Sequence, residues 1–173
     1  MHDARQRTCQ RRRVWSLSPV ENLMLWSMRA WVLDRFHGIA LAEEIEEAMD
    51  AVGAPGAMRP LDAMMGALNG GAVRLIEVNC VCCEEVSPDE LALLECLALA
   101  QRDRPAEAAR RLAGLAMPHT LEECVRAIRP LARQLLRAGH GLPLRAGGGG
   151  GVVVPFEARP AASPTLHLSL IHI

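Results

Sequence analysis

Apolar residues in the middle of the chain recur at helical spacing, in segments separated by glycine and proline. The first segment begins at Ser18, and the spacing Ser18-Pro19-x-Glu21 predicts a capping box at a helix N-terminus. Gly38 offers the left-handed residue that ends many helices, so we expect this helix to end at about His37. Because apolar residues occupy most of its circumference, we expect it in the centre of the domain.

The same pattern predicts further helices, two of them with capping boxes. Ser87 with Glu90, and Thr120 with Glu123, repeat the arrangement at Ser18. We expect Asn69-Gly70-Gly71 to end the third helix, a loop or short strand over 72–78, and a kink or break at Pro130. The fold class is therefore all-α, a compact bundle of five to six helices, with the further helices at residues 40–52, 60–68, 88–102, 105–115 and 121–138.

Short strings recur between the two halves of the chain. Ser18-Pro19-x-Glu21 matches Ser87-Pro88-x-Glu90, and Arg59-Pro60-Leu61 matches Arg129-Pro130-Leu131. One interpretation is two related three-helix units joined by a Cys-rich connector. The alternative is chance, because helix starts solve one physical problem with the same residues.

Composition agrees with helices and suggests domain boundaries. Only 3% of residues are aromatic, so leucine, alanine, valine and methionine must build the core, which favours helices. We expect residues 1–16, with five Arg and one acid, to be a disordered basic N-terminal extension. Residues 17–145 form the predicted helical domain. Residues 146–173, with a glycine run, are expected to be a disordered tail that is partly artefactual, because the last six residues resemble a translated sequencing adapter.

Charge and hydropathy restrict the partners. Residues 17–145 carry 13 Arg and 18 acids, which argues against nucleic-acid binding by the domain, although the basic extension could contact phosphates. No apolar run reaches the ~20 residues of a membrane span, and no signal peptide is evident. We therefore expect a cytoplasmic protein without a membrane role, whose partner is another protein or a second copy of itself.

The cysteine cluster Cys80-Val81-Cys82-Cys83 is the sequence's one hint of chemistry. Cys80, Cys82 and Cys83 could hold zinc if His119 and Cys124 completed the ligand set. They could instead form a redox-sensing thiol pair, although the adjacent Glu84 and Glu85 are expected to raise the thiol pKa values. A third interpretation is that these cysteines are small apolar residues in a packed connector.

No pattern typical of an enzyme occurs in the sequence. A phosphate-binding glycine loop, a G-x-S-x-G elbow and an H-E-x-x-H zinc motif are all missing. We therefore predict no catalytic residues and a non-enzymatic helical interaction or regulatory module. The alternative is a thiol-based protein, either zinc-binding or redox-sensing, centred on the cysteine cluster.

Overall fold

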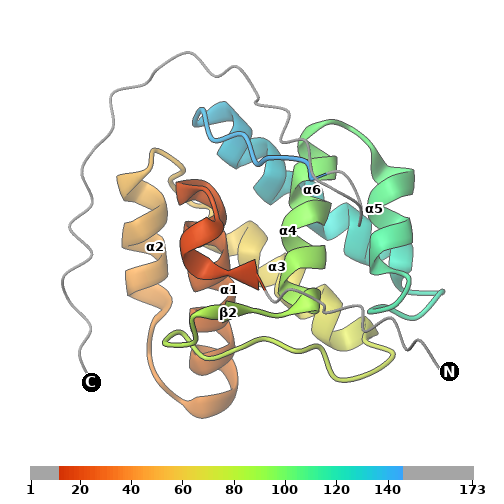
Figure 1. Cartoon of the computed structure of the whole chain (residues 1–173), viewed down its shortest axis with the longest axis horizontal. Helices are drawn as coiled ribbons and strands as arrows, with labels where there is room; N and C mark the ends of the chain where they lie inside the picture. The colour runs from red at the N-terminus through yellow and green to blue at the C-terminus, as the bar shows by residue number, and fades with distance from the viewer. Residues whose placement is uncertain (1–11, 146–173) are drawn as a thin grey trace, which may run out of the picture.

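Six α-helices and a two-stranded antiparallel sheet make up residues 12–145, the part of the chain that the computed structural model describes (Figure 1). The predicted all-α fold is confirmed. The expectations for residues 1–11 and 146–173 lie outside the described residues. The helices are α1 (Pro19–His37), α2 (Ala42–Ala51), α3 (Met58–Gly71), α4 (Pro88–Gln101), α5 (Pro105–Leu112) and α6 (Leu121–Arg137), and the strands are β1 (Arg12–Arg13) and β2 (Glu85–Val86).

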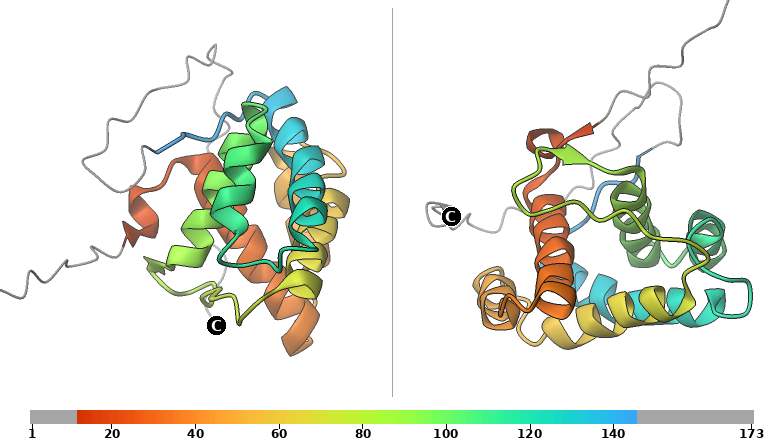
Figure 2. Two further views of the ribbon diagram at one scale, coloured as in Figure 1. Left: turned by 90° about the vertical axis from the view of Figure 1, so that its right-hand side faces the viewer. Right: turned by 90° about the horizontal axis from the view of Figure 1, so that it is seen from below.

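The helices are arranged as two sets of three. Each of α1, α2 and α3 contacts the other two, and so does each of α4, α5 and α6. The sets meet where α3 lies beside α6 and α1 beside α4, with α2 and α5 on opposite sides (Figures 1 and 2). The same pattern of helix contacts in both sets agrees with a duplication. However, Pro60 lies in the first turn of α3 and Pro130 in the middle of α6, so one recurring string falls at different places. The duplication stays a prediction.

The core is built from leucine and methionine side chains contributed by every helix. Helix α1 buries Met24, Leu25, Met28 and Trp31 against its neighbours, which agrees with its predicted central position. Dense packing of such side chains is the main source of stability in a fold without a large sheet.

Two of the three predicted capping boxes form. The Ser18 backbone N–H donates to Glu21 Oε2 at 2.8 Å, and the Ser87 backbone N–H donates to Glu90 Oε2 at 2.8 Å. Both serine hydroxyls in turn accept from the third helical residue. Both boxes therefore satisfy free N–H groups at the start of their helices.

The third predicted capping box is wrong. Thr120 precedes α6, but its hydroxyl donates to the carbonyls of Gly71 at 3.2 Å and Met117 at 3.1 Å. Helix α3 ends at Gly71, within the Asn69-Gly70-Gly71 string that was expected to end it. A Cβ atom at Gly71 would collide with the Thr120 side chain, so this glycine permits the close approach of α3 and α6.

Pro130 does not split α6, which runs without a break from Leu121 to Arg137. Since proline has no N–H, the Arg126 carbonyl has no helical donor at this point.

The segment before α1 differs from its prediction. Residues 12–16 belong to the expected extension, yet Arg12–Arg13 pair with Glu85–Val86 and Val14–Ser16 form a 3₁₀ turn. The Val14 backbone N–H donates to the Glu84 carbonyl at 2.8 Å. Backbone pairing with β2 therefore fixes the described part of this segment against the fold.

A buried ion pair joins α1 to the start of α4. Arg29 Nε lies 2.7 Å from Glu90 Oε1 and Arg29 Nη2 lies 2.9 Å from Oε2, in a two-bond arrangement. The side chains are 2% and 0% exposed. Arg29 also donates to the carbonyls of Cys83 and Glu85, both at 2.7 Å, and Glu90 accepts from the Asn79 N–H at 2.9 Å. The pair therefore organises the connector between α3 and α4.

We expect Arg29→Met to lower the free energy of unfolding by about 3–5 kcal/mol, because Glu90 is left charged, buried and without its cation. Urea unfolding near neutral pH measures the loss. The double variant Arg29→Met/Glu90→Gln removes the unpaired charge and keeps an N3 residue that can complete the capping box.

This double variant should therefore be more stable than Arg29→Met alone. Arg126→Met is the matched control, because Arg126 pairs with Glu122 in solvent and its loss should cost less than about 1 kcal/mol. The two single variants are Arg29→Met and Glu90→Gln. If the double variant loses as much unfolding free energy as these two single variants lose together, this account is contradicted.

Candidate functional site

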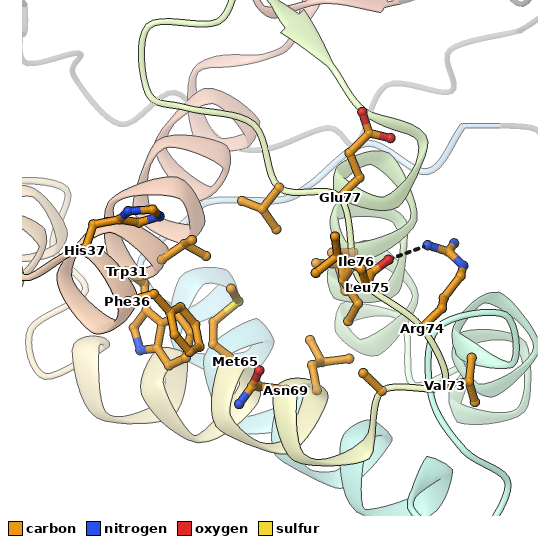
Figure 3. Close-up of a pocket in the computed structure, with 15 residues that line it drawn as sticks. Trp31, Phe36, His37, Met65, Asn69, Val73, Arg74, Leu75, Ile76 and Glu77 are labelled. Carbon is orange, nitrogen blue, oxygen red and sulfur yellow. Dashed lines mark hydrogen bonds between the residues drawn. The ribbon is translucent and has the colours of Figure 1, made fainter.

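An apolar pocket of about 700 Å³ lies between the C-terminal half of α1, helix α3 and connector residues 72–78 (Figure 3). Its inner surface includes Trp31, Met65, Leu68 and Leu93, all buried in the core. Its rim includes Phe36, Val73 and Leu75, which are exposed. These three are among only five large apolar side chains that are exposed in residues 12–145. The exposed apolar surface is thus concentrated at one opening.

The wall formed by α1 is held in place by specific contacts. The Trp31 Nε1–H donates to Asp62 Oδ1 at 2.9 Å, which links α1 to α3. The rings of Trp31 and Phe36 meet edge to face with centroids 5.9 Å apart. Because a hydrogen bond fixes one end of the indole and Phe36 packs on its ring, the aromatic wall has a defined geometry.

The opposite wall is connector residues 72–78, which form no helix and only one isolated bridge, from Ala72 to Ala116. Asp89, in the first turn of α4, fixes it from behind. Its carboxylate accepts from Arg74 Nη1 at 2.7 Å, from Arg74 Nη2 at 2.8 Å and from the Glu77 backbone N–H at 2.8 Å. These hydrogen bonds, the Arg74 guanidinium first, hold the pKa of Asp89 below its ordinary value despite its burial.

The polar side chains at the pocket are dispersed. His37, Asn69 and Glu77 come from α1, α3 and the connector, and they lie on different sides of the opening (Figure 3). All three are exposed to solvent. These three side chains therefore do not converge on one point of the opening.

The cysteine cluster forms a tight turn further along the connector. The Cys83 N–H donates to the Cys80 carbonyl at 3.0 Å, and the Sγ atoms of Cys80 and Cys82 lie 2.9 Å apart. Cys80 and Cys82 are exposed, and Cys83 is half-buried. The third interpretation, a packed connector, therefore does not describe Cys80 and Cys82.

The other predicted ligands lie elsewhere. Cys124 is buried in α6, where its thiol donates to the Ala67 carbonyl at 3.4 Å, and His119 is exposed in the loop before α6. Within residues 12–145 no group of three or more His, Cys, Asp or Glu side chains is placed to hold a metal ion. The structure thus does not bring Cys80, Cys82 and Cys83 together with His119 and Cys124 into a zinc ligand set.

The prediction that Glu84 and Glu85 raise the pKa of Cys80 is wrong. The pKa of Cys80 is lowered, first by a hydrogen bond from the Cys82 thiol and slightly by the Arg29 guanidinium, whereas the pKa of Cys82 is raised by the same hydrogen bond. Glu84 and Glu85 instead lie near Arg13, at 3.4 and 4.0 Å. The arginine on β1 therefore offsets the charges that follow the cysteines.

A second hollow, of about 660 Å³, follows the exposed face of α6 and is lined mainly by arginines. Arg126 pairs with Glu122 and Arg129 with Asp103, while Arg133 and Arg137 have no ion-pair partner among residues 12–145. Pairing in solvent contributes little free energy, so this hollow is a weaker basis for recognition than the apolar pocket.

The sequence did not reveal the pocket or the role of Arg29. A single arginine within the otherwise apolar first helix was the available signal for a buried ion pair. The pocket had no such signal, because its walls come from segments that are far apart in the chain.

Comparisons with known proteins give no family. No protein-family model, curated protein or solved structure matches this chain. No helix in the described range, residues 12–145, has the length and hydropathy to cross a membrane.

We expect Arg74→Gln to reduce the acid sensitivity of the fold. Because the folded pKa of Asp89 is lowered, its stabilisation is complete above its unfolded pKa of about 3.9 and is lost as the pH falls through the folded pKa. Without Arg74 the folded pKa moves back toward the unfolded value. The fall in unfolding free energy between about pH 7 and about pH 2 should then be smaller.

Urea unfolding across this pH range measures the effect. Arg133→Gln is the control, since it removes an exposed positive charge that has no ion pair among the described residues. An equal pH dependence in wild type and Arg74→Gln would show that Arg74 does not set the ionisation of Asp89.

Proposed function

We propose that this protein is a non-enzymatic interaction module whose apolar pocket binds apolar side chains of a protein partner. The observation that carries the proposal is the exposed apolar rim around an already formed apolar cavity. Its volume, about 700 Å³, falls in the range of about 300–1,000 Å³ that is typical of binding pockets. Exposed apolar surface concentrated in one place marks interaction sites in soluble proteins.

The rim favours a protein partner over a small ligand. Leu75 is 91% exposed, so an occupant confined to the cavity would leave it in water. A polypeptide that inserts one or two apolar side chains and continues across the rim would cover Leu75, Val73 and Phe36 together. Burying one leucine contributes about 1.5–3 kcal/mol. Contacts with the rim would therefore add substantially to the binding free energy that the cavity alone provides.

The walls support this function because they cost little to organise on binding. Trp31 is fixed by Asp62, and the connector is fixed by Asp89. A site that is ordered before its partner arrives loses less conformational entropy in the complex. Within residues 12–145, the polar side chains His37, Asn69 and Glu77 lie on different sides of the opening, which agrees with a binding role.

Selection of peptides from a random library on immobilised full-length protein tests the proposal. We expect enriched peptides to share apolar anchor residues. Leu75→Asp and Phe36→Asp should weaken their binding by about tenfold or more, since each removes apolar surface from the contact. Titration of a labelled selected peptide measures the affinity. Leu75 is 91% exposed, so its replacement leaves the core intact, whereas Phe36 also contacts the ring of buried Trp31, and circular dichroism verifies that Phe36→Asp folds.

Trp15→Asp is the matched control. Trp15 is 78% exposed and does not line the pocket, so its replacement should change peptide affinity less than twofold, that is by under about 0.4 kcal/mol. Failure to enrich any peptide, or peptides that bind Leu75→Asp and wild type equally, would reject the proposal. If instead an apolar dye binds wild type and Leu75→Asp alike and no peptide is selected, the pocket is a small-ligand site.

A further inference from the structure

We propose that Cys80 and Cys82 form a peroxide-reactive dithiol, in which Cys80 is oxidised first and Cys82 closes a disulfide with it inside the turn. This proposal concerns a modification site on the connector, and it is independent of the apolar pocket and its partner.

The geometry of the turn is the first support. The Sγ atoms of Cys80 and Cys82 are 2.9 Å apart, although both cysteines are free thiols. A disulfide needs Cα atoms roughly 4.4–6.8 Å apart, and a β-turn keeps even its first and fourth Cα atoms within about 7 Å. The turn over Cys80–Cys83 is closed by the backbone hydrogen bond from Cys83 to Cys80. Bond formation therefore needs a local sulfur movement and no rearrangement of the helices.

The surroundings distinguish the two thiols. Either thiol can be the donor in the hydrogen bond between the two sulfurs. With Cys82 as the donor, the bond favours the thiolate at Cys80, whose pKa is lowered, and the thiol at Cys82, whose pKa is raised. The Arg29 guanidinium lies behind the turn, held at the Cys83 carbonyl. A more acidic, exposed thiolate next to a second thiol is the usual arrangement of a redox-sensing cysteine with its resolving partner.

The chemistry balances with hydrogen peroxide as the oxidant. Cys80 thiolate attacks one peroxide oxygen, the O–O bond breaks, and hydroxide leaves and takes up a proton as water. Cys80 is then a sulfenic acid. Cys82 sulfur attacks Cys80 sulfur, the S–O bond breaks, and a second water leaves with the Cys82 proton. Two thiols are oxidised to one disulfide while one peroxide is reduced to two waters.

The remaining described cysteines are poor competitors. Cys96 and Cys124 are buried, and burial raises the pKa of Cys96 to about 12 and the pKa of Cys124 above its ordinary value. Cys83 is half-buried, and the two sulfurs that lie 2.9 Å apart are those of Cys80 and Cys82. Cys9 lies outside the described residues and is therefore controlled by substitution.

The test treats reduced full-length protein with one equivalent of hydrogen peroxide under native conditions. Thiol counting after denaturation should show the loss of two of the six thiols, and peptide mapping should find Cys80 linked to Cys82. Dithiothreitol should restore both. Cys82→Ser should accumulate a sulfenic acid that dimedone traps on Cys80. Cys80→Ser should react more slowly than wild type by about tenfold or more and should trap nothing on Cys82.

Cys83→Ser and Cys9→Ser are the matched controls and should behave as wild type. The substituted cysteines 80, 82 and 83 lie in a surface turn, and circular dichroism verifies that each variant folds. The proposal is overturned if the thiols react no faster than free cysteine, if dimedone marks Cys83, or if the disulfide involves Cys9. Protein purified under reducing conditions with stoichiometric zinc that Cys80→Ser loses would also overturn it, in favour of a metal site.

Discussion

The ion pair between Arg29 and Glu90 is the interaction on which the rest of this structure depends. Moving two charges from water into a protein interior costs several kcal/mol per ion, and only complete hydrogen bonding offsets that cost. Both Glu90 oxygens accept twice, from Arg29, from the Ser87 N–H and from the Asn79 N–H. Arg29 also donates from Nη1 and Nη2 to two connector carbonyls. The pair is therefore stable only when the connector lies where it does, so it specifies the path of a segment that has no regular structure.

The apolar pocket and the cysteine turn share this support. Ordering a residue costs about 1–2 kcal/mol of backbone entropy, and the connector has few internal hydrogen bonds to offset it. Two neighbouring acids in the first turn of α4 supply the contacts: Asp89 holds the part that forms the pocket wall, and Glu90 holds the part that leads into the cysteine turn. The start of α4 thus does more than begin a helix. It also holds the pocket wall and the cysteine turn in place, which precede and follow Asn79 in the connector.

The sequence predicts interactions between residues that are close together in the chain, and it does not predict those between distant segments. The boxes at Ser18 and Ser87 join residues three apart, so their pattern can be read directly from the chain. Thr120 has the same pattern, but the Gly71 carbonyl competes for its hydroxyl, and that carbonyl arrives only when α3 packs on α6. Gly71 ends α3 as the sequence predicts, but its role in the close packing of α3 on α6 could not be predicted, because it depends on the distant Thr120. The pocket, which needs α1, α3 and the connector at once, leaves no local pattern.

The cysteine turn shows how far sequence neighbours can mislead about electrostatics. Glu84 and Glu85 follow the cysteines directly, and from the sequence their charges should suppress a thiolate. In the fold, β1 pairs with β2 and places Arg13 beside both carboxylates, while Arg29 approaches the turn from the core. The pKa of Cys80 is therefore lowered first by the thiol of Cys82 and to a smaller extent by Arg29, which is far away in sequence. Because Arg13 lies on the short strand before α1, the pairing of that strand with β2 determines which positive charge lies beside the two acids that follow the cysteines.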